Sequence, residues 1–218
     1  MPSSRWARWS PVGGVLFVAL YLIGLALTSS PDSGKPDEKI VAHYAKAGTR
    51  HQDIASFFLI LAAGLAFVWF LAVLRNRLTR SEGGPGPWTA AAFGAGFVSI
   101  ALWIAGFGLF TAPSFARVDT HRFVLDANTF RILNDLGYAL WFSGTTVAAV
   151  IVFSTAFLSL RTRVLPTWLT WLSFVVAATM LVSFFFVPLL IFLGWVLVTS
   201  LIFLWRELRP AAGAPAMT

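Results

Sequence analysis

The sequence predicts an all-α protein: a single polytopic membrane bundle of six transmembrane helices that covers residues 1–218. Hydrophobic residues make up 58% of the chain and charged residues 11%, whereas about a quarter of the residues in a soluble domain are charged. The mean hydropathy is +0.78. The apolar residues also form runs of about 20, the length of helix that crosses a bilayer core. This composition excludes a soluble globular domain and a disordered chain.

Six apolar segments predict the spans. The last apolar stretch, Leu165 to Trp205, carries no charge and is about 60 Å long as a single helix, twice what a membrane accepts. Pro188 divides it, because the residue before a proline is pushed out of the helical region, and a hairpin is expected near Val187-Pro188. The predicted spans are residues 11–28, 54–74, 88–110, 136–160, 166–186 and 189–205, with outer loops 29–52 and 111–134.

The distribution of charge predicts that both termini are cytoplasmic. In that orientation the inner segments hold nine Arg residues and two Glu residues, which sum to +7. The outer loops and their borders hold seven basic and seven acidic residues, which sum to zero. Positive charge on the cytoplasmic side is the usual orientation signal of multi-pass proteins. We therefore expect a plasma-membrane protein whose partner is the lipid bilayer. We expect no nucleic-acid partner, because the sequence contains no soluble basic domain to bind one.

The N-terminal segment has a second interpretation. Arg5 and Arg8, followed by an apolar run that ends at Ala26-Leu27-Thr28, are also typical of a signal peptide. Thr28 is a mediocre residue before a cleavage site, and Pro11 suits the start of a helix. A retained first span is therefore favoured.

The first outer loop predicts a short helix. Pro36-Asp37-Glu38 is a typical helix start, with acidic residues in the first turn. Ile40, Val41 and Tyr44 would share one face of that helix. We expect this face to lie against the membrane or against the bundle.

The histidines predict a candidate metal site. All three lie on the outer side of the chain, and two of them have an Asp two residues away. His51, Asp53, His121 and Asp119 would bind zinc if the two outer loops meet, because zinc accepts His and carboxylate ligands. However, no HExxH or HxxxH pair places two ligands on one helix face. Ordinary polar loop residues are the favoured interpretation.

The candidate ligand-binding residues lie at the outer ends of two spans. Asn134 and Asp135 lie at the outer mouth of the fourth span, Tyr138 follows one turn later, and Asp53 lies directly before the second span. Ionisable groups at a membrane often mark functional sites. Arg131 lies four residues before Asp135, on the same helix face. This spacing predicts an ion pair at the interface, in preference to a catalytic or proton-carrying acid.

Several reactive groups are absent from the spans. No Lys, Arg, Asp, Glu or His lies in the middle of a span, although ion-coupled carriers usually need such groups at depth. Haem of the cytochrome b kind would need His inside the spans. The chain contains no Cys, which excludes disulfides, iron–sulfur clusters and a cysteine nucleophile.

The third span carries a stripe of small residues. Its members are Ala90, Gly94, Ala101, Ala105 and Gly108. Small residues let membrane helices approach closely. We expect the stripe to pack inside the monomer, and a homodimer through the third span is the alternative.

One segment resembles a known group of proteins. Residues 161–172, RTRVLPTWLTWL, resemble the R-x-x-x-LP-x-WL-x-x-L start of the fifth span in small six-span bacterial membrane proteins of actinobacterial type and unknown function. Pro166 suits a first helical turn, and Trp168 and Trp171 would anchor it at the inner interface. The resemblance implies the same layout of spans, but it identifies no catalytic residue.

Three classes of function follow from these patterns. The favoured one is a non-catalytic bundle that binds a lipid, a hydrophobic small molecule or a membrane partner. A small transporter or channel is the alternative, and an outer-face metal-dependent enzyme acting on lipid is the second alternative. Membrane hydrolases of the ceramidase type hold three His, an Asp and a Ser within helices, whereas every His here is expected in an outer loop. We therefore expect no cofactor unless zinc binds to the outer loops.

Overall fold

The prediction of an all-helical fold is confirmed. The computed structural model describes residues 11–120, 123–182 and 186–208, and within these ranges it contains seven helices and no strand. The helices are α2 (Val12–Leu27), α3 (Asp37–Ala45), α4 (Ala47–Glu82), α5 (Pro87–Asp119), α6 (Ala127–Thr162), α7 (Thr167–Met180) and α8 (Val187–Leu208).

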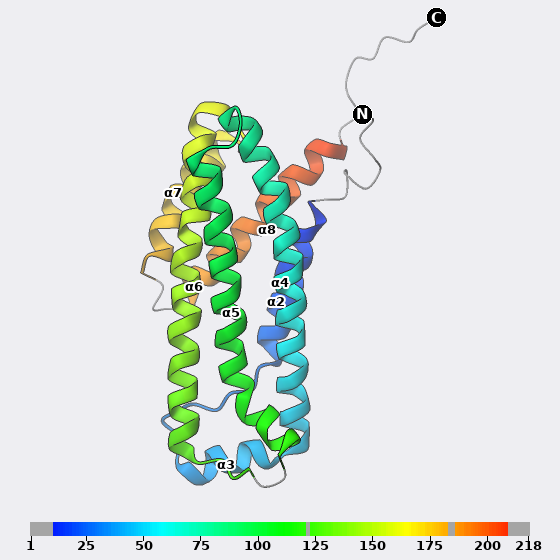
Figure 1. Cartoon of the computed structure of the whole chain (residues 1–218), viewed down its shortest axis with the longest axis vertical. Helices are drawn as coiled ribbons and strands as arrows, with labels where there is room; N and C mark the ends of the chain where they lie inside the picture. The colour runs from blue at the N-terminus through cyan, green and yellow to red at the C-terminus, as the bar shows by residue number, and fades with distance from the viewer. Residues whose placement is uncertain (1–10, 121–122, 183–185, 209–218) are drawn as a thin grey trace, which may run out of the picture.

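Six of the helices form a closed ring. Helices α5, α6, α7 and α8 each pack against the helix that precedes them in the chain. Helix α2 closes the ring, because it packs against both α4 and α8. Figure 1 shows that α4, α5 and α6 run the length of the bundle, whereas α3 lies across one end. We call this the α3 end. The first turn of α2 and the last turn of α8 lie toward the opposite end.

Four helices, α4, α5, α6 and α8, are long and apolar enough to cross a membrane, and α2 and α7 are apolar but shorter. The 36 residues of α4 make a helix of about 54 Å, longer than a bilayer core of about 30 Å. The predicted spans 54–74, 88–110 and 136–160 therefore lie inside α4, α5 and α6, whose ends project beyond the apolar part.

The predicted hairpin at Val187-Pro188 lies several residues too late in the chain. Helix α7 ends at Met180, and Pro188 lies in the first turn of α8. Proline is tolerated there because the first N–H groups of a helix have no partner within it. The predicted fifth span, 166–186, is consequently a helix of only 14 residues.

The turn between α4 and α5 is held by Glu82. Helix α4 ends at Glu82 and is followed by Gly83, whose φ of 83° favours glycine. The Glu82 carboxylate accepts hydrogen bonds from the Trp88 and Thr89 amides and from Thr89 Oγ1, at 3.2, 3.0 and 2.6 Å. Desolvation alone would raise the pKa of Glu82, but these hydrogen bonds outweigh it and lower the pKa. The N-terminal amides of α5 are thereby satisfied.

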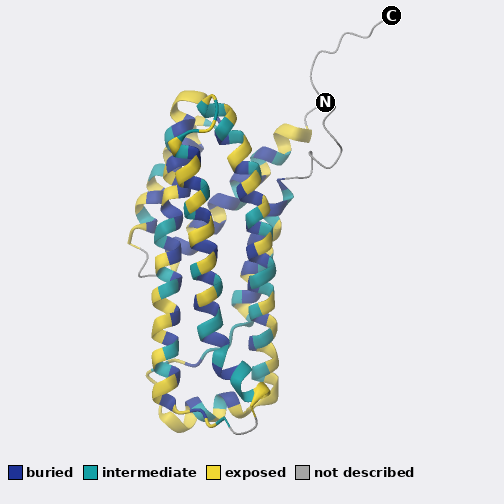
Figure 2. Ribbon diagram, viewed as in Figure 1, coloured by how far each residue is buried: buried dark blue, intermediate teal, exposed yellow. Residues whose placement is uncertain are grey.

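Aromatic side chains form the centre of the core, and buried residues face the interior of the bundle (Figure 2). The Trp103 ring lies 6.1 Å from Phe17, 5.9 Å from Tyr21 and 5.8 Å from Phe67, measured between ring centroids. Phe17 and Tyr21 come from α2, which is therefore a packed part of the bundle. Phe192 adds a contact from α8 at 5.7 Å.

Three buried indole N–H groups join helices to one another. Each donates to a hydroxyl on a different helix, so that none is left unsatisfied in apolar surroundings. The pairs are Trp103 with Thr145 at 3.3 Å, Trp141 with Tyr21 at 2.7 Å, and Trp195 with Ser173 at 2.8 Å.

Most of the small-residue stripe of α5 does not pack inside the monomer. Ala90, Gly94, Ala101 and Ala105 are exposed, whereas Gly108 is half-buried near Phe57. The close approach of α5 to α6 instead uses Gly106 and Gly137. Their backbones meet so tightly that a Cβ on Gly106 would lie 2.8 Å from the Gly137 carbonyl oxygen. The homodimer through α5 stays a prediction.

Replacing Gly106 with alanine should therefore destabilise the protein. The added methyl group has no space at the α5–α6 contact, and overpacking of this kind costs about 1–3 kcal/mol. Thermal unfolding of the purified protein in detergent measures the effect. The matched control is Gly94→Ala, because nothing lies within 4 Å of a Cβ at Gly94. Equal melting temperatures for the two variants would contradict the proposed contact.

Candidate functional site

A non-helical segment crosses the α3 end of the bundle. Residues 28–36 connect α2 to α3, and we call them the crossing segment. Its first residue, Thr28, shares a 2.7 Å hydrogen bond with Ser56 of α4. Both hydroxyl oxygens also lie within hydrogen-bond distance of the Gly24 carbonyl oxygen, at 3.1 Å for Thr28 and 2.6 Å for Ser56. Each hydroxyl carries one proton, so two of these three bonds form at a time. The last turn of α2 is thereby attached to α4.

Asp53 holds the next residue of the crossing segment. Its carboxylate accepts hydrogen bonds from the Ser29 amide at 3.2 Å, from Ser29 Oγ at 3.0 Å and from Ser114 Oγ at 2.6 Å. Asp53 is only 2% exposed, and neither ion pair of the described ranges involves it. A buried carboxylate without a cation requires hydrogen bonds of this kind. Asp53 therefore joins α4, α5 and the crossing segment.

Asn134 plays a similar part on α6. It is buried, and its Oδ1 accepts a 3.2 Å hydrogen bond from Ser30 Oγ. His43 of α3 adds a hydrogen bond between its Nε2 and the Ser29 carbonyl oxygen. The crossing segment is thus bonded to α3, α4 and α6, and Asp53 links it to Ser114 of α5.

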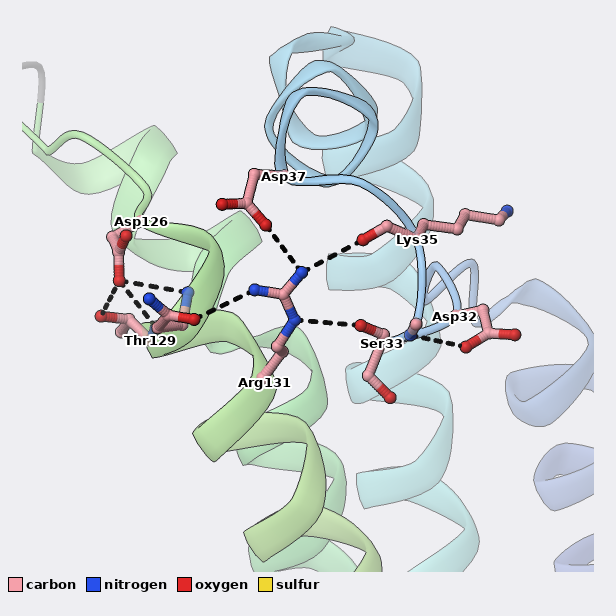
Figure 3. A network of polar contacts seen from close by, with 9 residues as sticks. Asp32, Ser33, Lys35, Asp37, Asp126, Thr129 and Arg131 are labelled. Carbon is pink, nitrogen blue, oxygen red and sulfur yellow. Dashed lines mark hydrogen bonds and ion pairs between the residues drawn. The ribbon is translucent and has the colours of Figure 1, made fainter.

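Arg131 holds the far part of the crossing segment, as Figure 3 shows. Its guanidinium donates to the carbonyl oxygens of Ser33 and Lys35 at 3.0 and 3.1 Å, and it pairs with Asp37 at 2.7 Å. The predicted ion pair between Arg131 and Asp135 is therefore wrong. Arg131 instead bonds the chain nearly a hundred residues earlier, because the crossing segment presents several oxygens to it.

The short helix α3 begins as predicted, directly after Pro36. Its apolar side packs against the bundle, where Ile40 and Tyr44 form a small core with Leu125 and Phe130. Desolvation raises the pKa of Tyr44, so this hydroxyl stays neutral. The structure therefore assigns the expected apolar face of α3 to the bundle.

The candidate metal ligands do not meet in the described part of the chain. His51 and Asp53 are two residues apart on α4 and point to different sides, so that His51 is exposed while Asp53 is buried. Asp119 is also exposed, and His121 lies outside the described residues. Within the described ranges no group of three or more His, Asp or Glu residues could hold a metal ion.

Asp135 and Tyr138 line a groove on the outside of α6. Because α7 has only 14 residues, it leaves the half of α6 nearest the α3 end uncovered on this side (Figure 1). The groove has a volume of about 640 Å³ and its lining includes Phe142, Val147 and Leu181. Asp135 is exposed and forms no ion pair with a described residue. The groove thus combines one acid with apolar walls.

A smaller cavity of about 90 Å³ lies under the crossing segment. Thr28 and Ser30 line it from that segment, and Phe110 and Trp141 line it from the helices. Tyr138 borders both this cavity and the groove. The candidate residues therefore divide into two pairs. Asp135 and Tyr138 face the groove, whereas Asp53 and Asn134 hold the crossing segment.

Sequence reasoning missed the partners of this network. Ser29, Ser30 and Ser114 hold no special place in any motif, and serines are common in loops and at helix ends. Asp53 itself could be singled out from the sequence, because an acid next to an apolar span needs hydrogen-bond partners for its carboxylate.

No family model, curated protein or solved structure matches the chain. The resemblance of residues 161–172 to small six-span bacterial membrane proteins therefore stays a prediction.

Replacing Asp53 with alanine should loosen the α3 end. The change leaves Ser29 and Ser114 without their acceptor, and buried donors without partners cost about 1–3 kcal/mol. Thermal unfolding should show the loss, and hydrogen exchange should rise at the amides of residues 28–36. Asp119→Ala is the control, since Asp119 is an exposed acid at the same end. Unchanged exchange in Asp53→Ala would contradict this role.

Proposed function

We propose that the protein is a plasma-membrane protein with six spans and cytoplasmic termini that binds an amphiphile, a lipid or hydrophobic small molecule with a polar head, in the α6 groove. The protein contributes a binding surface and no chemical step. The groove of about 640 Å³ beside Asp135 is the observation that carries this proposal.

The membrane location is supported by four long apolar helices. In this proposal α2 and α7 supply the two further crossings, because they complete the ring with the long helices. Exposed Trp168, Trp171 and Trp205 lie near the ends of α7 and α8 opposite the α3 end. Indole rings favour membrane interfaces, so these residues suit the inner boundary, and the α3 end then faces outside.

The chemistry of the groove favours an amphiphile with a basic head. Asp135 is the charged residue in its lining, and it borders the predicted span 136–160, where lipid head groups lie. Tyr138, which is 43% exposed, offers a hydroxyl and a ring next to it. Phe142, Val147 and Leu181 continue inward and suit an alkyl chain, whose burial is favourable.

The groove lacks the parts of a hydrolytic site. Its Ser143 hydroxyl donates to the Ala139 carbonyl oxygen at 2.8 Å, and no histidine stands among its lining residues. A serine nucleophile needs an adjacent base. Binding without catalysis is the function that this lining supports best.

The proposed orientation predicts the labelling of single cysteines, which the native chain does not contain. A cysteine at Ser81 should react with an impermeant thiol reagent only after the cells are permeabilised. A cysteine at exposed Gly48, in the first turn of α4 at the α3 end, should react in intact cells. The reverse pattern would overturn the orientation, and labelling of both in intact cells would overturn the number of spans.

The groove predicts selective binding of a long-chain amine. Dodecylamine should bind the purified protein in native mass spectrometry more tightly than dodecanol, and Asp135→Asn should weaken amine binding about ten-fold, as loss of a charge-assisted hydrogen bond does. Tyr138→Ala should weaken both ligands. Glu38→Gln, an exposed acid on α3, is the control. Equal binding to wild type and Asp135→Asn would contradict the proposal, as would proton-coupled solute uptake that Asp135→Asn abolishes.

A further inference from the structure

A second pocket lies on another part of α6. It has a volume of about 360 Å³ and is bounded by α5, α6 and α7. Trp88, Phe153 and Phe174 supply aromatic walls, and small residues such as Ala178 leave the space between them. No charged residue is among its lining. Leu181 is the one residue that this pocket shares with the α6 groove. We call the second pocket the Ser154 pocket, after the serine in its lining.

The aromatic walls of the Ser154 pocket hold one another in place. The Trp88 ring stacks on Phe157 with 4.2 Å between centroids and lies 6.2 Å from Phe153. Phe153 and Phe174 meet edge to face at 5.6 Å. Contacts of this kind favour defined ring orientations. The pocket is therefore lined by rings that are supported from behind.

Ser154 is the polar group of this pocket, and its hydroxyl has no partner. The residue is 1% exposed, and its Oγ forms no hydrogen bond within the described structure. Thr155 and Ser159 on the same helix behave differently, because each donates to the carbonyl oxygen four residues before it, at 2.7 and 2.6 Å. Thr199 and Ser200 of α8 also lack partners, but they line none of the pockets described above.

An unpartnered hydroxyl in apolar surroundings is unfavourable, because it has lost water without gaining another partner. The alkyl chains of lipids cannot satisfy it, since they contain no acceptor. Ser154 lies about 10 Å from Arg161 along α6, at 1.5 Å per residue, and hence deeper than the ester groups of lipids whose heads lie near that arginine. A bound molecule with its own oxygen would satisfy the hydroxyl.

We propose that the Ser154 pocket binds an uncharged aromatic ketone or quinone, whose carbonyl oxygen accepts a hydrogen bond from Ser154 Oγ. The rings of such a molecule match the walls formed by Trp88, Phe153 and Phe174, and the absence of charge in the lining matches an uncharged ligand. The volume of about 360 Å³ falls in the range of small-molecule sites. This site shares only Leu181 with the amphiphile groove and does not depend on Asp135.

Benzophenone is a suitable probe, because it is an uncharged diaryl ketone that cross-links to nearby C–H groups under ultraviolet light. The full chain, purified in detergent, is irradiated with increasing benzophenone, and the modified peptides are identified by mass spectrometry. We expect saturable cross-linking within residues 149–154 or 174–178. Ser154→Ala should raise the half-saturating concentration about three- to ten-fold, as loss of one neutral hydrogen bond does. Ala178→Phe should fill the pocket and abolish the saturable part.

The controls separate binding from folding and from partition into the micelle. Ser159→Ala, a buried serine whose hydroxyl has a partner, should leave the half-saturating concentration unchanged. Ser154→Ala should keep or raise the melting temperature, because it removes an unsatisfied polar group. Cross-linking that rises linearly with benzophenone concentration would overturn the proposal. The same half-saturating concentration in wild type and Ser154→Ala would also overturn it. Asp135→Asn should have no effect, so a failed amine experiment leaves this result interpretable.

Discussion

Polar groups buried in this bundle must find partners within the protein, because an apolar environment contains no water to receive them. The three buried indoles meet this requirement through hydroxyls on other helices, and each bond therefore also fixes the position of one helix against another. Many buried hydroxyls bond the preceding turn of their own helix instead. The hydroxyls of Ser154, Thr199 and Ser200 meet the requirement in neither way, and of these three residues Ser154 is the one that lines a pocket described above.

The same constraint explains the α3 end. Asp53 is a carboxylate that the fold has buried, and its three donors come from two distant parts of the chain. Satisfying it brings the crossing segment over the helix ends, where Arg131 and Asn134 bind its later residues. A non-helical segment is thereby held by side chains of three helices, α3, α4 and α6. The fixed end of α2 then allows Tyr21 to reach Trp141 in the core.

The short length of α7 accounts for the Asp135 groove. A helix of 14 residues cannot cover a neighbour of 36 residues, so the side of α6 nearest the α3 end remains open as the Asp135 groove. Farther along α6, small residues of α6 and α7 leave the Ser154 pocket. One site is open and has an acid at its edge, whereas the other is apolar with a single hydroxyl. The two therefore suit ligands of different charge.

The sequence by itself determined the helical class, the apolar segments and the start of α3, because these follow from local composition and from spacing along the chain. It also marked Asp53, Asp135 and Tyr138 as candidates. Only the tertiary structure decided what each side chain meets. The four-residue spacing of Arg131 and Asp135 permitted an ion pair, yet the oxygens of the crossing segment outcompeted it, and the glycines that pack α5 on α6 lie outside the small-residue stripe. Such outcomes depend on how each helix is rotated in the ring, which is set by contacts between residues far apart in the chain.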